Sequence, residues 1–561
     1  MSEARPETSV NDRDPLLSER IAPQRERAQC RVAVGLGDAL AGAARQWGER
    51  EALVYRHQPA VADVAWSYAE LDATADRLAA SLVAQGYRPG ERIAIWGPNH
   101  PEWILLEYAI AKAGLVLVAL NPLYRPGELA FALGDSNAAA IFHADLIGGA
   151  PAATIVAEAR PDVPALRGVH AFSSIWTALL PAAPDRLPRV EVDPGEALMI
   201  QYTSGTTGVP KAVRLSHAAI ATTARNSYRR WGLGEGDRVC VGFPLFHVGG
   251  SGNSVPGACL NGATLLPLHI FKPGIALDIL EQERCTAFIG VPTMLIAMLD
   301  DPSIAGRRLD ALATIIVGGA PVTRDLLARC RATFGADVIN CYGQTETCGV
   351  TTTTILGDGV DKKTRTSGTP LVGVSVSIRD GDGRPVPRNA IGQLFYSGPG
   401  AMTGYGSRPG VEDESGWVAS GDLATMDEDG YVAIVGRAKE MIIRGGENLS
   451  PVEIETYMKE HDAIGDVAVV GVPDPKYGEV VCAVVHLRPG HAVSGTAIRD
   501  WCAARISRWK VPHYVEFVDE FPLTPSGKIQ KFRLRKDMSE RLGLVEDPPL
   551  GATPSIEDAR T

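Results

Sequence analysis

The chain of 561 residues is too long for one ordinary hydrophobic core, so the sequence predicts at least two domains. Hydrophobic residues make up 45% and charged residues 22%, as in an ordinary globular protein. The formal net charge of -11 excludes the basic surface of a nucleic-acid-binding protein, so we expect no nucleic-acid partner.

The N-terminal segment, residues 1–30, is polar and lacks the apolar core of a signal peptide, so we expect a disordered tail. The stretch 103–123 is strongly apolar but contains Glu107 and Lys112, which favours a buried helix and a strand over an integral membrane span. The nine cysteines form no C-x-x-C pair. They indicate reduced, core-packed thiols in a cytoplasmic protein.

Helical stretches alternate with short apolar runs from residue 31 to residue 437, which predicts α/β layers with mainly parallel sheets. Residues 366–431 are richer in glycine, proline and short strands. The predicted fold class is therefore α/β, with a large N-terminal domain (31–437) of two layered α/β subdomains plus a small β subdomain. A smaller α+β C-terminal domain follows over 438–540, in which Ser450, Pro451 and Glu453 predict a helix with a capping box. Residues 541–561 read as a second tail.

The segment "YTSGTTGVPK", from Tyr202 to Lys211, follows an apolar run. Gly205 and Gly208 permit left-handed backbone angles, so successive amides can face one anion. Hydroxyl groups and the Lys211 charge add further donors, which indicates a polyphosphate-binding loop although the Walker A pattern is absent. The alternative is a flexible loop without a ligand. The residues after Lys211 predict a strand, with a helix only from His217.

Four segments in order resemble the motifs of the adenylate-forming superfamily, which includes acyl-CoA synthetases, firefly luciferase and peptide-synthetase adenylation domains. They are "YTSGTTGVPK" (202–211), "NCYGQTE" (340–346), "SGDLATMDEDGYVAIVGRAKEMI" (420–442) and "PLTPSGKIQK" (522–531). The resemblance covers almost the whole chain between the tails. It implies an AMP-forming acid–thiol ligase: a carboxylate attacks ATP to give acyl-adenylate and pyrophosphate, and CoA then displaces AMP.

The resemblance also implies which residues bind the nucleotide. Glu346 and Thr207 would hold Mg²⁺, and Thr345 would contact the α-phosphate. Asp422 would bind both ribose hydroxyls, and Arg437 would add a ribose and phosphate contact. The other expected ATP and AMP contacts, with Asn340 reading the adenine amino group and Tyr342 stacking near the base, are Thr203, Ser204, Gly205, Thr206, Thr207, Gly208, Lys211, Gly319, Ala320, Pro321, Asn340, Cys341, Tyr342, Gly343 and Gln344.

The C-terminal domain is expected to be mobile, on the same resemblance. Lys439 would be its hinge between the two half-reactions. Lys528 would enter the site only for adenylation, where it bridges the carboxylate and the α-phosphate. Coenzyme A, the expected co-substrate beside the cofactors ATP and Mg²⁺, would pass Gly445, Gly446 and Glu447.

The same resemblance implies that the acid binds beside His247, which would act as a gate, with Val248, Gly249, Gly318 and Gly343. The small residues that follow His247 predict a roomy apolar pocket. We therefore expect a medium- or long-chain fatty acid, or a bulky alicyclic, aromatic or steroid-derived acid, and a role in fatty acid metabolism.

Alternatives remain open at this point. A stand-alone adenylation enzyme could load the acyl group onto a separate carrier protein. A luciferase-like oxygenase and a nucleotide-binding sensor are further readings, and the sensor is disfavoured because Lys528 is present. The oligomeric state also stays open, with a homodimer among the alternatives.

Overall fold

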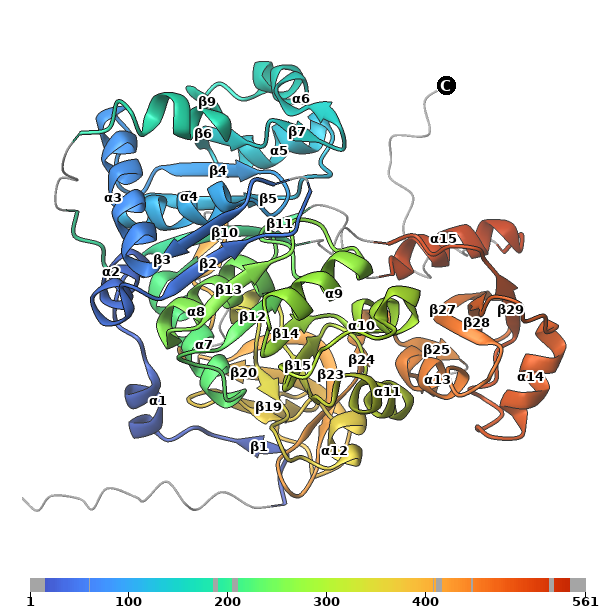
Figure 1. Cartoon of the computed structure of the whole chain (residues 1–561). Coiled ribbons are helices and arrows are strands. Elements are labelled where there is room, and N and C mark those ends of the chain that lie inside the picture. The colour runs from blue at the N-terminus through green and yellow to red at the C-terminus, as the bar shows by residue number, and fades with distance from the viewer. Residues whose placement is uncertain are drawn as a thin grey trace, which may run out of the picture. The chain divides into compact units, whose positions relative to one another are not determined.

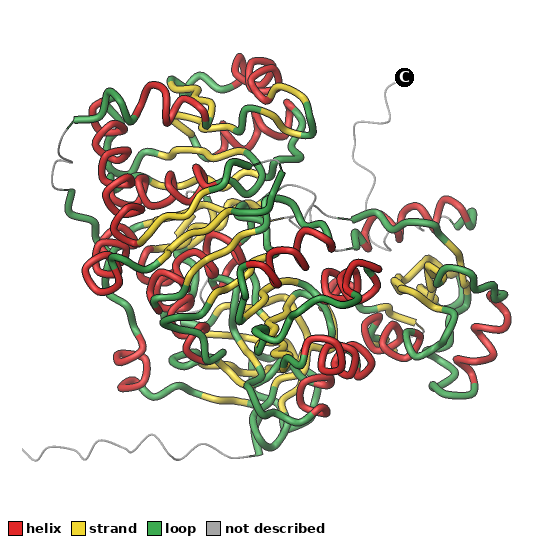
Figure 2. The backbone as a smooth tube through the Cα atoms, in the orientation of Figure 1, coloured by secondary structure: helices red, strands yellow, loops and turns green. Residues whose placement is uncertain are grey.

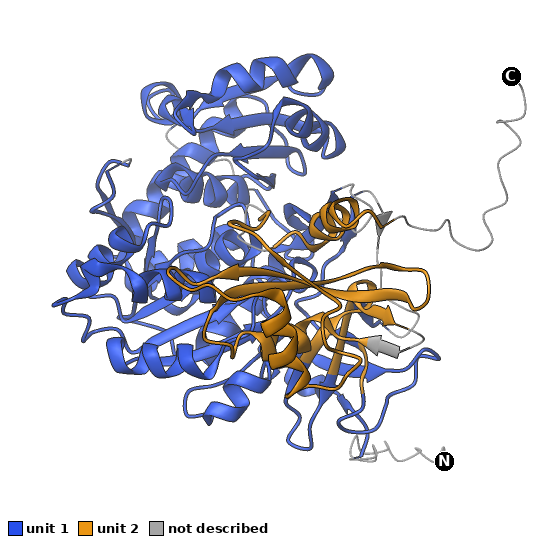
Figure 3. Cartoon of the chain, turned by 90° about the vertical axis from the view of Figure 1, so that its right-hand side faces the viewer, with its two compact units in different colours: residues 1–390, 394–420, 425–433 blue, residues 391–393, 421–424, 434–561 orange. Residues whose placement is uncertain are grey.

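The computed structural model describes residues 16–59, 61–184, 190–203, 210–406, 408–409, 416–444, 447–523 and 529–544. The chain divides into two compact units (Figure 3). Unit 1 holds residues 1–390, 394–420 and 425–433, and unit 2 holds 391–393, 421–424 and 434–561. The main division thus falls at 433–434, close to the boundary at 437–438 expected from the sequence.

The first sheet of unit 1 is eight-stranded and mainly parallel (Figure 1). Its strands, in sheet order, are β22 (Arg408–Pro409), β21 (Gly404–Tyr405), β11 (Lys211–Ser216), β10 (Ala197–Thr203), β5 (Val116–Leu120), β4 (Arg92–Trp96), β6 (Ala138–His143) and β9 (Gly168–Ala171). β10 and β11 form an antiparallel pair.

Helices cover both faces of this sheet. In β4, Ile93 and Ile95 pack in one apolar cluster with residues of α3 (Tyr68–Ala84) and α4 (Pro101–Lys112). The alternate residues Ala94 and Trp96 pack in another cluster with α5 (Pro126–Asp135) and α6 (Ala152–Ala159). Because side chains alternate along a strand, a strand buried on both faces reads as a continuous apolar run. Short elements complete this part: β7 (Leu146–Ile147), β8 (Ala150–Pro151), η1 (Arg160–Asp162) and η2 (Ile175–Leu179).

The second sheet of unit 1 is nine-stranded (Figure 2, yellow strands). In sheet order its strands are β18 (Thr369–Pro370), β17 (Thr352–Thr353), β16 (Asp337–Tyr342), β15 (Thr314–Gly318), β14 (Ala287–Gly290), β12 (Arg238–Val241), β13 (Thr264–Pro267), β2 (Glu51–Tyr55) and β3 (Val64–Ser67). Its helices are α2 (Leu36–Trp47), α7 (His217–Arg230), the π-helix η3 (Val248–Ser254), α8 (Val255–Asn261), α9 (Pro273–Gln282), α10 (Pro292–Asp300), η4 (Pro302–Ile304), α11 (Arg324–Phe334), η5 (Thr345–Thr347) and α12 (Val360–Arg365).

A five-stranded sheet corresponds to the predicted small β subdomain. Its order is β1 (Glu19–Arg20), β19 (Ser375–Arg379), β20 (Gly392–Ser397), β23 (Val418–Met426) and β24 (Val432–Arg437).

The expected N-terminal tail is wrong for residues 16–30. β1 pairs antiparallel with β19, and α1 (Gln24–Cys30) ends at a buried cysteine. The main-chain N–H of Ala22 donates to Ser375 Oγ at 2.8 Å, and Ala22 is buried. A two-residue strand has no periodicity of its own, so only its distant partner makes it a strand.

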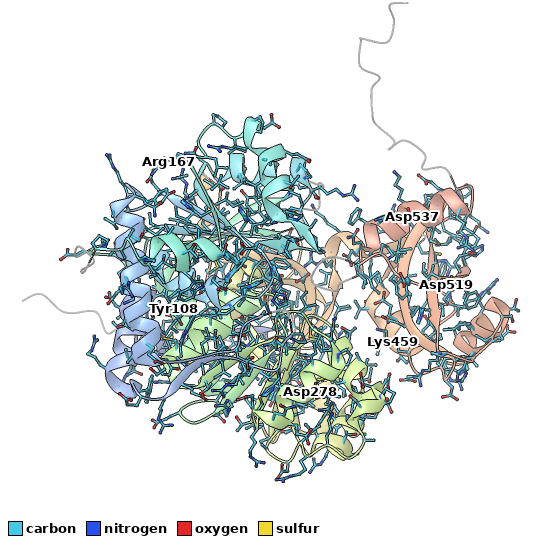
Figure 4. The ribbon with its side chains drawn as sticks, turned by 45° about the horizontal axis from the view of Figure 1, so that its top comes forward. Tyr108, Arg167, Asp278, Lys459, Asp519 and Asp537 are labelled. Carbon is cyan, nitrogen blue, oxygen red and sulfur yellow. The ribbon has the colours of Figure 1, made fainter. Side chains whose placement is uncertain are left out.

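Unit 2 is an α+β layer built on a five-stranded sheet. Its elements are η6 (Ala438–Glu440), β25 (Ile442–Arg444), β26 (Glu447–Leu449), α13 (Pro451–Met458), β27 (Ile464–Asp474), β28 (Gly478–Leu487), α14 (Gly495–Ala503), β29 (Tyr514–Phe517) and α15 (Lys531–Arg541). α13 and α14 pack on one face of the long β27–β28 pair, and α15 packs on the other. Tyr108 marks α4 of unit 1 and Lys459 marks the end of α13 in Figure 4.

Two expectations for unit 2 need correction. Only half of the predicted capping box forms, because Ser450 Oγ accepts from the Glu453 N–H at 3.2 Å while the Glu453 carboxylate pairs with Lys510 Nζ at 2.5 Å. The C-terminal tail does not begin at residue 541, since Leu542 and Leu544 pack against the apolar cluster between α15 and the β27–β28 pair.

The nine cysteines are all free thiols, and eight of them are buried, as the sequence predicted. Within the described part of the chain, every helix is too short or too polar to cross a bilayer. The expected cytoplasmic location stays a prediction.

Candidate active site

The β10–β11 hairpin carries the predicted phosphate loop. Thr203, the last residue of β10, pairs with Lys211, the first residue of β11. Ser204, Gly205, Thr206, Thr207 and Gly208 lie outside the described residues, between these paired ends. β11 runs to Ser216 and α7 begins at His217, so a strand and not a helix follows Lys211, as predicted.

A carboxylate, a phenol and an ammonium group meet beside this hairpin. Tyr405 Oη donates to Glu346 Oε1 at 2.9 Å, and Lys211 Nζ lies 5.1 Å from the centroid of the Tyr405 ring. Tyr405 is placed there by strand β21, which pairs with β11 at Val213. Burial and then the Glu346 charge raise the pKa of Tyr405 well above its ordinary value, so its hydroxyl stays a donor. The sequence reasoning missed Tyr405.

The loop that presents Glu346 is folded tightly. The main-chain N–H groups of Thr347 and Gly349 both donate to the carbonyl of Gln344, at 3.0 Å each. The Glu346 carbonyl accepts from the N–H of Met402 at 2.9 Å, which ties the loop to the segment before β21. A Cβ on Gly343 would lie 2.2 Å from the Gly349 carbonyl oxygen, so glycine is required there for packing. Thr345 is buried at the start of this turn.

Two further motif segments leave the nine-stranded sheet side by side. Gly318 at the end of β15 is the register partner of Cys341 in β16, and the strands are parallel. Gly319, Ala320 and Pro321 follow as exposed residues, and Gly319 has a φ of +84°. In open α/β sheets, ligands bind beyond the carboxyl ends of the strands, where these segments lie.

The predicted ribose residues also lie together, in unit 2. Arg437 Nε is 3.2 Å from Asp422 Oδ1. The Asp422 side chain is 6% exposed and that of Arg437 is 53% exposed, so the arginine holds a buried carboxylate from the solvent side. Lys439, the expected hinge, is exposed in η6. Gly445, Gly446 and Lys528 fall outside the described residues, and Glu447 opens strand β26.

An aromatic and cationic cluster of unit 2 was not anticipated. The Arg444 guanidinium lies 5.4 Å from the ring centroids of both Tyr477 and Trp509, and Arg444 Nη1 donates to the Trp509 carbonyl at 2.6 Å. The two rings are 5.9 Å apart at 88°. Trp509 is 45% exposed, so an aromatic face remains open beside the residue that precedes Gly445.

The acyl-side segment comprises residues 243–262, and its His247 caps the π-helix η3. Its Nδ1 accepts from the Gly249 N–H at 3.1 Å, so Nδ1 carries no proton. The His247 ring stacks on Phe243, with the centroids 5.9 Å apart and the planes at 15°. Val248 is buried and its Cγ1 would be 3.6 Å from a Cβ on Gly349, which brings this segment next to the loop after Glu346.

The inference from small residues to a roomy pocket is wrong in this segment. An added Cβ on Gly250 would lie 2.3 Å from the Pro244 carbonyl oxygen, and on Gly252 2.7 Å from Val248 Cγ2. On Gly257 it would lie 2.3 Å from a Tyr228 ring carbon. These glycines are small because neighbours already fill the space, and not because they line an empty one.

The predicted site residues of the described ranges therefore fall into two groups, one in each unit. Unit 1 brings together the hairpin ends, Glu346 and the acyl-side segment, and unit 2 brings together Asp422 and Arg437. Within the described ranges, no cluster of three or more His, Cys, Asp or Glu side chains could hold a metal ion by itself.

Comparison with known proteins defines the class. Residues 40–406 match the AMP-binding enzyme family, and residues 453–528 match the AMP-binding enzyme C-terminal domain. The chain belongs to this adenylate-forming family, whose members bind ATP.

Within that family the chain is an AMP-forming acid–CoA ligase. It is 37% identical over 497 residues to a feruloyl-CoA synthase of Amycolatopsis sp, covering 87% of this chain and 98% of the relative. It is 32% identical to the human medium-chain acyl-CoA ligase ACSF2, mitochondrial, covering 91% and 88% of the two chains. The crystal structure of ATP-bound MatB from Rhodopseudomonas palustris superimposes with a TM-score of 0.81 at 28% identity, over 91% of this chain and 100% of that one.

Proposed function

We propose that the protein joins an apolar carboxylic acid to CoA, with ATP and Mg²⁺, through an acyl-adenylate. The Glu346–Tyr405–Lys211 cluster carries the proposal. A carboxylate and a triphosphate repel each other, so their reaction needs fixed positive charge and a held geometry. The cluster offers one hard oxygen ligand and one cation at the mouth of a Ser/Thr/Gly hairpin.

The donor set fits a magnesium ion. Mg²⁺ prefers a few carboxylate or hydroxyl oxygens completed by phosphate oxygens and water. Glu346 supplies a half-buried carboxylate whose Oε1 is oriented by Tyr405, and Thr207 would supply a hydroxyl from the undescribed part of the hairpin. When bound, the ion would neutralise phosphate charge. The described residues themselves would orient the nucleotide and keep Glu346 in place.

Nucleotide recognition follows from the groups that are already held. Asn340 Nδ2 donates to the Thr366 carbonyl at 3.0 Å, which leaves its carbonyl oxygen to accept from an adenine amino group. Asp422, steadied by Arg437, would accept from the ribose hydroxyls. Thr345 and Lys211 would contact the phosphates.

The second half-reaction would use unit 2. Lys528 would serve adenylation only, and rotation about Lys439 would then bring Gly445, Gly446 and Glu447 to the thioester site. The exposed Trp509 face beside Arg444 suits the adenine and phosphate parts of CoA, because an indole stacks on a base and a guanidinium attracts a phosphate.

The acid is proposed to be an aromatic or a medium- to long-chain fatty acid. Residues 239–271, which include the acyl-side segment, contain no Lys, Arg, Asp or Glu. Such a segment offers nothing to pair with an amino group or a second carboxylate. The two curated relatives described above are named for ferulic and medium-chain acids.

The test is product analysis with ATP, Mg²⁺, CoA and a panel of acetate, octanoate, palmitate, benzoate, ferulate and a sterol side-chain acid. We expect acyl-CoA, AMP and pyrophosphate, with acetate a poor substrate. If acyl-adenylate forms but acyl-CoA never does, while a carrier protein is acylated, the carrier-loading alternative replaces this proposal.

A further inference from the structure

Asn99 holds the acyl-side segment at its first turn. It follows β4, is 4% exposed, and uses its whole side-chain amide on main-chain atoms. Nδ2 donates to the carbonyl of Phe243 at 3.0 Å and to that of Leu268 at 2.8 Å, and Oδ1 accepts from the Leu245 N–H at 2.7 Å. One buried amide therefore satisfies three main-chain groups that would otherwise lack a partner.

These bonds join the two large sheets of unit 1. β4 belongs to the eight-stranded sheet, whereas Phe243 and Leu268 follow the neighbouring parallel strands β12 and β13 of the nine-stranded sheet. The main-chain carbonyl of Asn99 also accepts from His269 Nδ1 at 2.9 Å. All of the joined groups lie at carboxyl ends of parallel strands, the edge where ligands bind in such sheets.

The segment that Asn99 fixes in turn places the residues assigned to the acyl side. The Phe243 ring stacks on His247 at 5.9 Å, and a Cβ on Gly249 would lie 3.0 Å from two atoms of the same ring. A shift of the Phe243 main chain would therefore move His247 or collide with Gly249.

We propose that Asn99 is a positioning residue that sets acid selectivity by fixing the Phe243–His247–Gly249 arrangement, without touching the acid. The inference rests on the proposed function of that segment. It assigns a selectivity role to a side chain outside every motif named above. Because Asn99 would act on the site through Phe243, we expect ATP binding to be unchanged.

Gln58 offers a matched control. It is 6% exposed, its Nε2 donates to the Pro267 carbonyl at 3.0 Å, and its Oε1 accepts from the His269 N–H at 2.6 Å. It therefore clamps the end of β13 with the same amide chemistry, but none of its bonds reaches residues 243–249.

The experiment compares Asn99→Asp with Gln58→Glu, since each change replaces an amide NH₂ by an oxygen that cannot donate when ionised. Thermal unfolding and kcat/KM are measured for octanoate, palmitate, benzoate and ferulate, together with KM for ATP. For Asn99→Asp we expect about a 10-fold or larger fall in kcat/KM for the best acid and an altered order of acids, with KM for ATP within about twofold. For Gln58→Glu we expect a lower melting temperature and the wild-type order of acids.

An unchanged order of acids in folded Asn99→Asp, or an equal change in both variants, overturns the inference. If Asn99→Asp does not fold, Phe243→Leu replaces it, because this change keeps the Asn99 bonds but removes the ring beside His247. Phe243→Leu should also alter the order of acids, and a wild-type order would overturn the inference. A wild-type protein that converts none of the acids would instead refute the proposed function, and the inference with it.

Discussion

The loop end of the β10–β11 hairpin, residues 202–211 (the hairpin edge), and the acyl-side segment are similar in sequence but differ in structure. Both are rich in glycine and small polar residues. At the hairpin edge, polar groups converge, since Tyr405 binds Glu346 and Lys211 lies over the Tyr405 ring. In the acyl-side segment, Gly250, Gly252 and Gly257 are covered by protein atoms. A glycine in a motif thus predicts close approach, and only its neighbours show whether a ligand or a side chain approaches.

Polar motifs carry more information than glycines for a physical reason. A polar group beside a buried surface needs a partner, whereas an absent side chain needs only a neighbour of the right shape. The comparison therefore predicts that substitutions at the hairpin edge change chemistry, and that substitutions in the acyl-side segment change packing first.

The largest effect is expected for Glu346→Gln. Replacing the carboxylate by an amide removes the charge that would hold Mg²⁺, so ATP–pyrophosphate exchange should fall by about 100-fold or more. Thermal unfolding without ligands should stay close to wild type, because the retained oxygen can still accept from Tyr405. Exchange within tenfold of wild type would remove Glu346 from the proposed magnesium site.

Gly257→Ala should act on stability. Its Cβ would lie 2.3 Å from a ring carbon of Tyr228, a fully buried side chain whose hydroxyl donates to the Ser254 carbonyl at 3.1 Å. Overpacking of this kind costs about 1–3 kcal/mol of unfolding free energy, measurable by urea denaturation. Gly127→Ala in α5 is the control, since nothing lies within 4 Å of its Cβ and the helix should gain slightly. Equal stability of the two variants would mean that position 257 has spare volume after all.

Tyr405→Phe tests the hydroxyl of the cluster while keeping the ring beneath Lys211. Losing the hydrogen bond to Glu346 should weaken Mg²⁺-dependent exchange about tenfold, visible as a higher Mg²⁺ requirement. Tyr396→Phe is the matched control. The Tyr396 hydroxyl is buried near Glu346 without a hydrogen-bond partner among the described residues, so its removal should leave exchange unchanged. If both variants lose activity alike, the hydrogen bond is not what matters.

The smallest effect is a loss of stability at acid pH. It arises in α7, the helix that adjoins both the hairpin and the acyl-side segment. His217 begins α7 directly after β11, and Tyr228 of the same helix covers Gly257. Burial lowers the pKa of His217 from 6.5 to about 4. Below pH 6.5 the His217 imidazole therefore binds a proton in the unfolded chain but not in the folded chain. Stability is lost as the pH falls toward 4.

Between pH 6.5 and 5.5 this linkage should cost wild type about 1 kcal/mol of unfolding free energy relative to His217→Asn. Asparagine is neutral and can accept, as His217 Nδ1 does, from the Leu36 N–H. The measurement is urea unfolding of both proteins at the two pH values. Parallel pH profiles would show that His217 is not the titrating group.

Much of the fold could be predicted because its signals are local. The strand after Lys211, the helix at His217, the strands at 375–379 and 392–397, and the buried helix and strand at 103–123 follow from short-range patterns. The motif segments 318–321 and 340–346 were recognised by their residue types, and the structure places them at the ends of the parallel strands β15 and β16.

The rest depends on pairings between distant residues. Tyr405 reaches Glu346 only because β21 pairs with β11, about 190 positions earlier in the chain. Asn99 donates hydrogen bonds to the main chain of Phe243 and Leu268. Arg444 contacts the rings of Tyr477 and Trp509. No periodicity within a window of residues encodes such partners, and they follow only from the completed sheets.

The N-terminal strand β1 has a consequence for biosynthesis. Ala22 leaves the ribosome 353 residues before Ser375, whose hydroxyl receives its main-chain N–H. At about 5–20 residues per second, that interval lasts roughly 20–70 s. The segment therefore cannot form its native pairing until β19 has been synthesised, and it then covers the open edge of β19. Until then the nascent chain exposes a strand edge of the kind that recruits other chains.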